Sequence, residues 1–184
     1  MSSPIFTGQS LGTIIAPISY YGCKFSTISA IILTDLGIWV IGPPGQYSSI
    51  SVGLYDSSGN LIGSTVSVST SGPTGVYAYT ALGSPINLTI STDYFLMAQL
   101  LFNEAYSGAN TTVTPSSVVS VIDSATGVPG SFSLDGNGAN HCHGPVNALY
   151  TTGSATASLK LNALLNGISA SGPFFANPLG YPVH

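Results

Sequence analysis

Ser48-Ser-Ile-Ser-Val-Gly-Leu-Tyr55, which runs directly into Asp56-Ser-Ser-Gly-Asn60, is the stretch that decides the fold class. Ile50, Val52 and Leu54 alternate with small residues, so these apolar side chains share one face of an extended strand. The five residues that follow have the composition of a tight turn. The stretch therefore predicts a half-buried strand that ends in a hairpin.

The same period of two recurs along the chain, whereas helical periodicity is nearly absent. Further strands are predicted at 61–68, 76–80, 86–90, 94–102, 110–122 and 154–161. The run 94–102 is apolar except for Gln99 and contains no helix breaker, so it could form a helix, but a turn-forming Ser-Thr-Asp precedes it and we interpret it as a central strand. Short strands separated by Gly and Pro predict an all-β protein, an antiparallel β-sandwich of the jelly-roll kind.

We expect one domain over residues 1–184, with an N-terminal arm at 1–20, the sandwich at 21–165 and a C-terminal arm at 166–184. Both arms combine prolines, which disfavour central strands, with apolar and aromatic residues that favour burial. Each arm either packs on its own sandwich or docks on a neighbouring subunit. The candidate assembly contacts in the arms are Pro4, Ile5, Phe6, Phe174, Phe175 and Tyr181.

Charge is scarce. The 184 residues contain 2 Lys, no Arg and 6 acidic residues, so that 4% of the chain is charged and the net charge is −4. Roughly a quarter of the residues are charged in an ordinary soluble protein. Such a surface is either built from uncharged polar residues or covered by neighbouring molecules. With two scattered lysines we expect no nucleic-acid partner and no binding to a membrane.

The stretches Val52-Gly-Leu-Tyr-Asp-Ser-Ser-Gly-Asn-Leu-Ile-Gly63 and Tyr79-Thr-Ala-Leu-Gly-Ser-Pro-Ile-Asn-Leu-Thr-Ile-Ser-Thr-Asp-Tyr-Phe-Leu96 carry a resemblance to a known module. Together they resemble the jelly-roll module of choice-of-anchor surface proteins and of virion proteins of tailed phages. The likeness spans about residues 50–101. The surface proteins carry an export signal and an anchor, and neither is visible here. The resemblance therefore implies a virion protein, made in the cytoplasm of a host, and it supplies no catalytic residues.

Asn140-His-Cys-His-Gly144 is the only cluster with the character of metal ligands. If the segment is extended, His141 and His143 project from one face and could bind a metal across the axis of a symmetric trimer. The alternative is a loop with two partly exposed histidines beside a thiol. Cys23 and Cys142 are expected as buried thiols, although a long-range disulfide stays open.

The acidic residues lie in turns, where an aspartate ordinarily binds backbone N–H groups. No nucleophile motif is visible, so we expect neither an enzyme nor a cofactor. The function that fits best is a structural virion protein, a capsid decoration or cement subunit whose partners are its own copies and other virion proteins. The alternative is a carbohydrate-binding or adhesion module, in which aromatic side chains stack on sugars. Its candidate residues are Tyr20, Tyr21, Trp39, Tyr47, Tyr55, Tyr77, Tyr79 and Tyr106.

Overall fold

A computed structural model of the chain confirms the all-β antiparallel sandwich, since its described residues form strands and turns and no helix. The structure describes residues 1–8, 13–16, 19–40, 48–100, 104–107, 111–143 and 146–152, with the backbone alone at 13–16, 104–107 and 111. The described residues belong to one compact unit, Met1–Thr152. The strand predicted at 154–161, the boundary at 165 and the C-terminal arm with Phe174, Phe175 and Tyr181 lie outside them.

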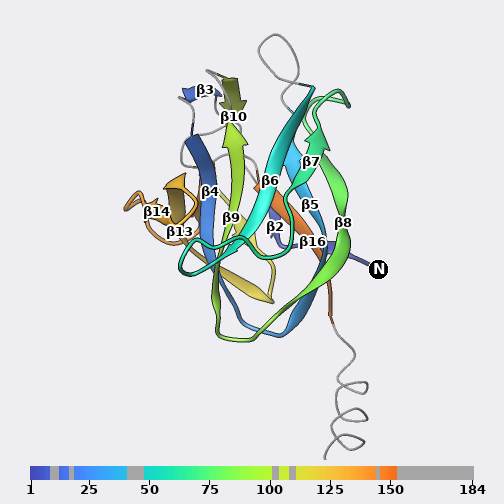
Figure 1. Ribbon diagram of the computed structural model, residues 1–184, viewed down its shortest axis with the longest axis vertical. Helices are drawn as coiled ribbons and strands as arrows, with labels where there is room; N and C mark the ends of the chain where they lie inside the picture. Colours follow the sequence, from blue (N-terminus) through green and yellow to red (C-terminus); the bar gives the residue numbers. More distant parts are fainter. Residues whose placement is uncertain are drawn as a thin grey trace, which may run out of the picture. The chain divides into compact units, whose positions relative to one another are not determined.

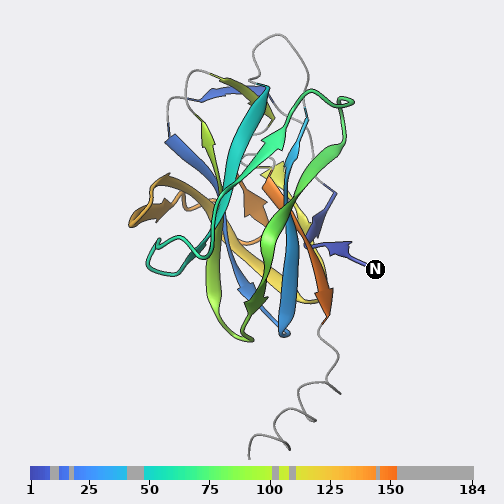
Figure 2. The ribbon, with the colours of Figure 1, turned by 45° about the vertical axis from the view of Figure 1, so that its right-hand side comes forward.

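Two antiparallel sheets face each other across the core (Figures 1 and 2). The four-stranded sheet has the order β1 (Ser3–Pro4), β16 (Val146–Thr152), β5 (Ile31–Trp39) and β8 (Tyr77–Leu88). The six-stranded sheet has the order β14 (Ser131–Leu134), β13 (Val119–Val128), β4 (Ser19–Thr27), β9 (Asp93–Leu100), β6 (Ser49–Asp56) and β7 (Val66–Ser69). The run predicted as a central strand is β9, which lies in the middle of this sheet.

Three short pairs of strands complete the described part of the chain. They are β10 (Glu104–Ser107) with β3 (Thr13–Ala16), β11 (Thr111–Thr112) with β15 (His141–Cys142), and β12 (Thr114–Pro115) with β2 (Phe6–Thr7). All three pairs join segments that are not neighbours in the sequence, and the last two bring the N-terminal segment and the histidine segment onto the sandwich.

The stretch quoted at the start forms β6 and the turn after it, as predicted. Ile50, Val52 and Leu54 are 3%, 0% and 0% exposed in the core between the sheets. The carboxylate of Asp56 accepts the backbone N–H groups of Ser58 and Asn60 and the side-chain amide of Asn60. These hydrogen bonds hold the pKa of Asp56 below its ordinary value, and the bond from the Asn60 side chain has the largest effect.

Four predicted strands differ in extent from those observed, and the one predicted at 110–122 is divided into β11, β12 and the start of β13. The return strand predicted at 61–68 is β7, only Val66–Ser69, preceded by an isolated bridge between Tyr55 and Leu61. The strands predicted at 76–80 and 86–90 are one strand, β8, whose pairing with β5 shifts register between Leu33 and Asp35. Pro85 lies within the shifted segment of β8, where its missing N–H removes a donor from the ladder.

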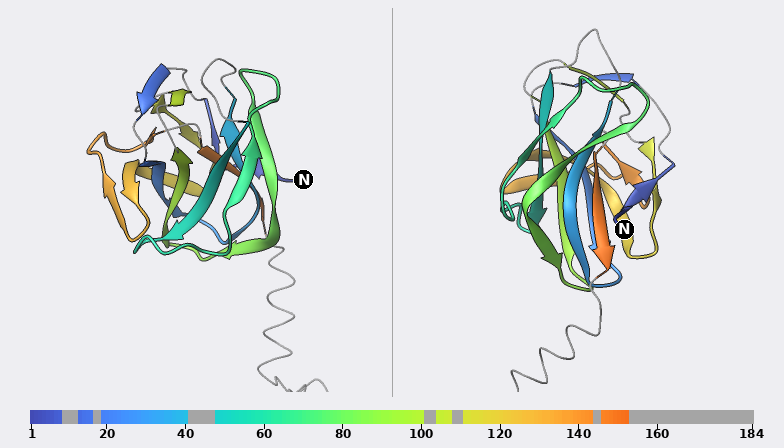
Figure 3. Two further views of the ribbon diagram at one scale, coloured as in Figure 1. Left: turned by 45° about the horizontal axis from the view of Figure 1, so that its top comes forward. Right: turned by 90° about the vertical axis from the view of Figure 1, so that its right-hand side faces the viewer.

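The expectation that residues 1–20 form an assembly arm is wrong for the part that the structure describes. Ile5 and Phe6 are 0% and 1% exposed and belong to the core of their own sandwich. Pro4 pairs with Leu149 in the sheet, beside the orange strand β16 (Figure 3). The boundary at residue 20 also falls inside a strand, because β4 begins at Ser19. The described N-terminal segment instead packs on its own sandwich, which was the other possibility that the sequence left open.

Asn147 explains why the N-terminal segment stays in place. Its side chain is fully buried, and its amide group hydrogen-bonds both the N–H and the carbonyl of Phe6, as the backbone of a neighbouring strand would. The amide oxygen of Asn147 accepts the Phe6 N–H at 3.2 Å, and its amide nitrogen donates to the Phe6 carbonyl at 2.9 Å. Beside it, the Ile5 N–H donates to the Ala148 carbonyl at 2.9 Å. The segment is thereby held against β16 at the edge of its own sheet.

The six-stranded sheet also buries part of its other face. Tyr55, Phe95, Met97 and Ala125 form a second buried cluster, and Tyr20 and Phe132 pack against it. Phe132 comes from β14, and its ring lies 5.0 Å from the ring of Tyr55 and 5.2 Å from that of Phe95. The hairpin β13–β14 turns at Pro129-Gly130, where Gly130 has φ 79°, and so covers this face.

Candidate functional site

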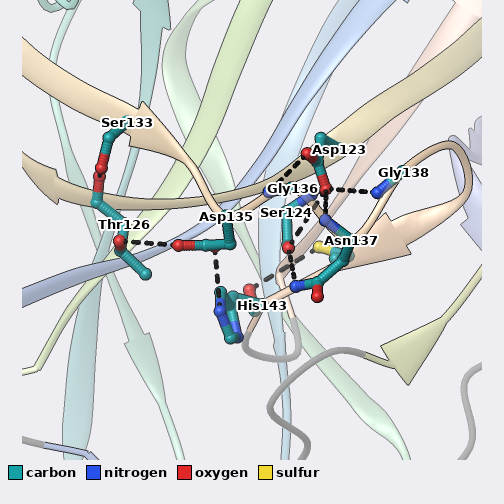
Figure 4. A network of polar contacts seen from close by, with 10 residues as sticks. Asp123, Ser124, Thr126, Ser133, Asp135, Gly136, Asn137, Gly138 and His143 are labelled. Atoms are coloured by element: carbon teal, nitrogen blue, oxygen red, sulfur yellow. Dashed lines mark hydrogen bonds and ion pairs between the residues drawn. The ribbon is translucent and has the colours of Figure 1, made fainter.

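The segment 135–143, called here the histidine loop, is anchored by Asp123 of β13. The Asp123 carboxylate is 5% exposed and accepts backbone N–H groups from both strand and loop. Its donors are Ser124 at 2.8 Å, Gly136 at 2.9 Å, Asn137 at 3.0 Å and Gly138 at 3.0 Å. Figure 4 shows these bonds converging on the carboxylate. A buried acceptor with this many donors fixes the shape of the loop.

The glycines of the loop make this arrangement possible. Gly136 and Gly138 have φ values of 74° and 89°, which side chains rarely adopt. With this backbone, three consecutive N–H groups of the loop reach one carboxylate. The side-chain amide of Asn137 in turn donates to the Ser124 hydroxyl at 2.8 Å. From the sequence, Asp123 was expected to bind backbone N–H groups in a turn, like the other aspartates. The pattern Gly136-Asn-Gly138 is the signal that could have indicated a loop whose N–H groups bind a carboxylate.

Asp135 and His143 form the ionisable pair of the loop. The Asp135 carboxylate oxygen Oδ2 lies 2.9 Å from Nε2 of His143, and Oδ1 accepts the Thr126 hydroxyl at 3.0 Å (Figure 4). The His143 ring packs edge to face on Tyr21, with centroids 5.8 Å apart. Burial lowers the pKa of His143, and this outweighs the opposing effects of Asp135 and Asp123. The pair is thus a hydrogen bond from a neutral imidazole to a carboxylate at neutral pH.

The two imidazoles use different nitrogens. Because a carboxylate only accepts hydrogen bonds, Nε2 of His143 carries its proton. Nδ1 of His141 lies 3.2 Å from the Gly138 carbonyl and 3.1 Å from that of Ala139, so His141 carries its proton on Nδ1. The loop therefore fixes opposite tautomers in residues that the sequence pattern treats as equivalent.

These contacts bear on the predicted metal site. Among the residues that the structure describes, no three His, Cys, Asp or Glu side chains are grouped so that they could hold a metal ion. The site across a trimer axis at His141 and His143 stays a prediction. Because Nε2 of His143 donates to Asp135, a metal would have to bind this ring at Nδ1, and a carboxylate on the other nitrogen is common for histidines that bind metals.

The aromatic residues separate into buried and partly exposed groups. Tyr55 is 2% exposed. Tyr20 and Tyr21 are partly exposed, but Tyr20 packs against the cluster around Tyr55 and Tyr21 packs against His143. Tyr47 and the side chain of Tyr106 lie outside the described residues. Trp39, Tyr77 and Tyr79 are partly exposed and form a continuous row, with centroids 5.0 Å apart for the first pair and 5.8 Å for the second.

The register of β5 and β8 places this aromatic row on one sheet face. Trp39 pairs with Tyr77 and Gly37 pairs with Tyr79, and residues two apart share a face. A Cβ atom on Gly37 would come within 2.4 Å of the Tyr79 ring, so the ring lies directly over the glycine. Burial raises the pKa of Tyr79 to about 12, with Asp35 adding to the effect. The row is a preformed apolar strip of the kind that sugars stack on.

A second exposed apolar feature lies at the turns. Ile28, between β4 and β5, is 52% exposed, and Ile90, between β8 and β9, is 54% exposed. The two turns adjoin, because the Ser91 N–H donates to the Thr27 carbonyl at 2.8 Å and the Thr27 N–H donates to the Thr92 carbonyl at 3.1 Å. We call Ile28 and Ile90 the isoleucine pair. It exposes large apolar side chains on two joined turns.

No model of a known protein family matches the chain, and no curated protein is significantly similar to it in sequence. The resemblance to surface and virion jelly-roll modules stays a prediction, as does the expectation that the chain is not an enzyme. Across the part of the chain that the structure describes, no helix has the length and apolar character needed to span a membrane.

Proposed function

We propose that this protein is a structural subunit that associates with further copies of itself, and that its specific role is that of a virion decoration or cement subunit. The proposal rests above all on one observation, which is that the chain has few charged side chains and that most of the described ones contact other groups of the same chain. The virion role draws additionally on the resemblance of residues 50–101 to virion modules.

The described charged residues mostly have partners within the chain. Lys24 pairs with Asp93 at 2.9 Å and lies over the Phe95 ring at 5.8 Å. Asp56 and Asp123 accept backbone N–H groups, and Asp135 pairs with His143. The Lys24–Asp93 pair balances one charge of each sign, whereas the hydrogen bonds to Asp56 and Asp123 orient these carboxylates and leave their charge in place. A chain with 4% charged residues matches the depletion of charged residues in the cores of protein interfaces.

The burial of Ile5 and Phe6 changes which surface would make the contact. Because these side chains are in the core, the N-terminal segment is not available to a neighbour. The isoleucine pair is available, and each of its side chains is about half exposed. Burying a fully exposed isoleucine contributes on the order of 1.5–3 kcal/mol, so burying a half-exposed one contributes roughly half of that. Two such side chains per subunit, repeated by symmetry, are a plausible nucleus for a contact between copies.

Sedimentation velocity on the full chain, from low to high micromolar concentration, tests the proposal. We expect the sedimentation coefficient to rise with concentration, and Ile28→Asp to abolish the rise. Val76→Asp is the matched control, because Val76 is a β-branched residue that is 46% exposed and lies in a different turn. A monomer throughout the range in the wild-type protein refutes self-association. Association that Ile28→Asp leaves unchanged refutes the role of the isoleucine pair.

A second function, carbohydrate binding, is favoured by the row Trp39, Tyr77 and Tyr79. A partly exposed strip of three rings on one sheet face suits stacking on a sugar. A glycan array with the wild-type chain and Trp39→Ala tests this, with Val76→Ala as a control that leaves the rings intact. Reproducible binding that only Trp39→Ala removes supports the function. An array without binding removes it.

A further inference from the structure

The two cysteines of the chain lie together in the core, although more than a hundred residues separate them. Cys23 is on β4 and Cys142 is on β15, and both are 0% exposed within one hydrophobic cluster. The structure has both as thiols. The Cys142 thiol donates to the His143 carbonyl at 3.7 Å, and Cys23 lies close enough to raise the pKa of Cys142 further, beyond the effect of burial. Next to them, the His143 N–H donates to the Gly22 carbonyl at 2.8 Å, so the backbones that carry the thiols are also joined.

We propose that Cys23 and Cys142 are a modification site, a cysteine pair that closes to an intramolecular disulfide under oxidising conditions. Because Gly22 and His143, the chain neighbours of the two cysteines, are joined by a backbone hydrogen bond, the two side chains can approach the S–S distance of about 2.05 Å without a change of fold. In the exchange reaction, one thiol loses its proton and its sulfur attacks a low-molecular-weight disulfide, which releases one thiol. The second cysteine then displaces the other half of the oxidant. Overall, two protein thiols and one small disulfide become one protein disulfide and two small thiols.

The surroundings of the pair predict slow closure in the folded protein. Both sulfurs are shielded from solvent, so that an oxidant cannot reach them without local opening. Burial also raises the pKa of Cys142, which keeps the reactive thiolate scarce at neutral pH. The disulfide would therefore form during folding, or slowly in the native state, and would resist reduction once formed.

The cross-link would join the six-stranded sheet to the segment that leads into β16 of the opposite sheet. It closes a loop of about 120 residues, and a loop of that length loses considerable entropy in the unfolded chain. It would also tie down the end of the histidine loop, since Cys142 directly precedes His143. The expected result is a rise in Tm of about 10 °C in the oxidised protein over the reduced protein.

The sequence makes the product simple to detect. Trypsin cleaves only after lysine or arginine, and this chain has only Lys24 and Lys160. Cleavage there gives fragments 1–24, 25–160 and 161–184, so Cys23 and Cys142 fall in different fragments. The full chain is unfolded in urea, refolded in a buffer of oxidised and reduced glutathione, alkylated and digested. Fragments 1–24 and 25–160 are expected to stay joined until a reductant is added.

The experiment distinguishes a cysteine pair that forms a disulfide from two buried thiols that only pack together. Refolding from urea gives the oxidant access to both sulfurs, so burial cannot hide a negative result. If both cysteines are alkylated after refolding, or only glutathione adducts or linked dimers form, the proposal is wrong. The variants Cys23→Ala and Cys142→Ala should each lose the linked fragments. Because the decisive comparison is between oxidised and reduced wild-type protein, it holds even where a variant fails to fold.

Discussion

Replacing Phe6 with alanine decides whether the N-terminal segment belongs to its own sandwich or to a neighbour. Phe6 is 1% exposed, and its ring packs edge to face on Phe25 with centroids 6.2 Å apart. The backbone bonds of Phe6 to Asn147 do not involve the ring, so the substitution leaves them in place. The variant removes side-chain packing and leaves the strand register unchanged.

The magnitude follows from the burial of the ring. Truncating a buried phenylalanine to alanine costs about 3–5 kcal/mol, which includes the lost transfer energy and the cavity. The edge-to-face contact accounts for about 1 kcal/mol of this. We expect Phe6→Ala to lower the free energy of unfolding by about 4 kcal/mol. In a domain of this size the Tm then falls by roughly 10 °C.

Urea unfolding followed by circular dichroism measures this loss, with the midpoint and slope compared between variants. Thr7→Ala is the matched control, because Thr7 is exposed and its hydroxyl makes one bond of 3.3 Å to the Thr114 carbonyl. Its effect should stay within about 0.5 kcal/mol. If Phe6→Ala costs less than about 1 kcal/mol while an oligomer dissociates, the segment serves a neighbour and our account of its burial is wrong.

Three further predictions concern polar groups. Asp123→Asn turns an amide NH2 toward backbone donors and should lower the free energy of unfolding by about 2–4 kcal/mol, with faster hydrogen exchange at residues 136–138. Since burial lowers the pKa of His143, its contribution to stability is present above about pH 6.5 and is lost as the pH falls; an NMR titration that gives a pKa above 6.5 would contradict this. Burial raises the pKa of Tyr55 and of Tyr79 to about 12, so their contribution is present below pH 10 and is lost as the pH rises toward 12. Tyrosinate absorbance should show several groups that ionise late, because burial also raises the pKa of Tyr77 and of Tyr21; full ionisation near pH 10 without unfolding would rule this out.

The parts of the fold that the sequence predicts well depend on neighbours in the chain. The strand with Ile50, Val52 and Leu54 needs only alternation, and the Asp56 turn needs only hydrogen bonds within five residues. The run 94–102 carried a further signal, because it is apolar on both faces. Such a run is typical of a strand covered on both sides, and the cluster around Phe95 shows that β9 is one.

The parts that the sequence could not predict depend on distant partners. The burial of Phe6 requires Asn147, which is 141 residues away, so composition alone left both possibilities for the N-terminal arm. The contact of Cys23 with Cys142 likewise follows from the path of β15 and from no local pattern. The pattern His141-Cys-His143 suggested equivalent imidazoles, but Asp135 and the loop carbonyls give them opposite tautomers. Local alternation could not reveal these partners.

The edges of the described sheets favour one mode for the proposed self-association over another. Pairing of edge strands is a common route by which β-proteins associate, and proline at an edge blocks it because it cannot donate to the ladder. Pro4 lies in the edge strand β1, which has only two residues, and Pro85 interrupts the edge strand β8. At the other sheet, the Thr80 hydroxyl of β8 donates to the Ser67 carbonyl of β7 at 3.1 Å and so occupies part of that edge. The fourth edge, β14, has four residues and stays open to pairing. If contacts between copies run through side chains of the turns instead, Ile28 and Ile90 are the candidates, and Ile28→Asp should break the contact.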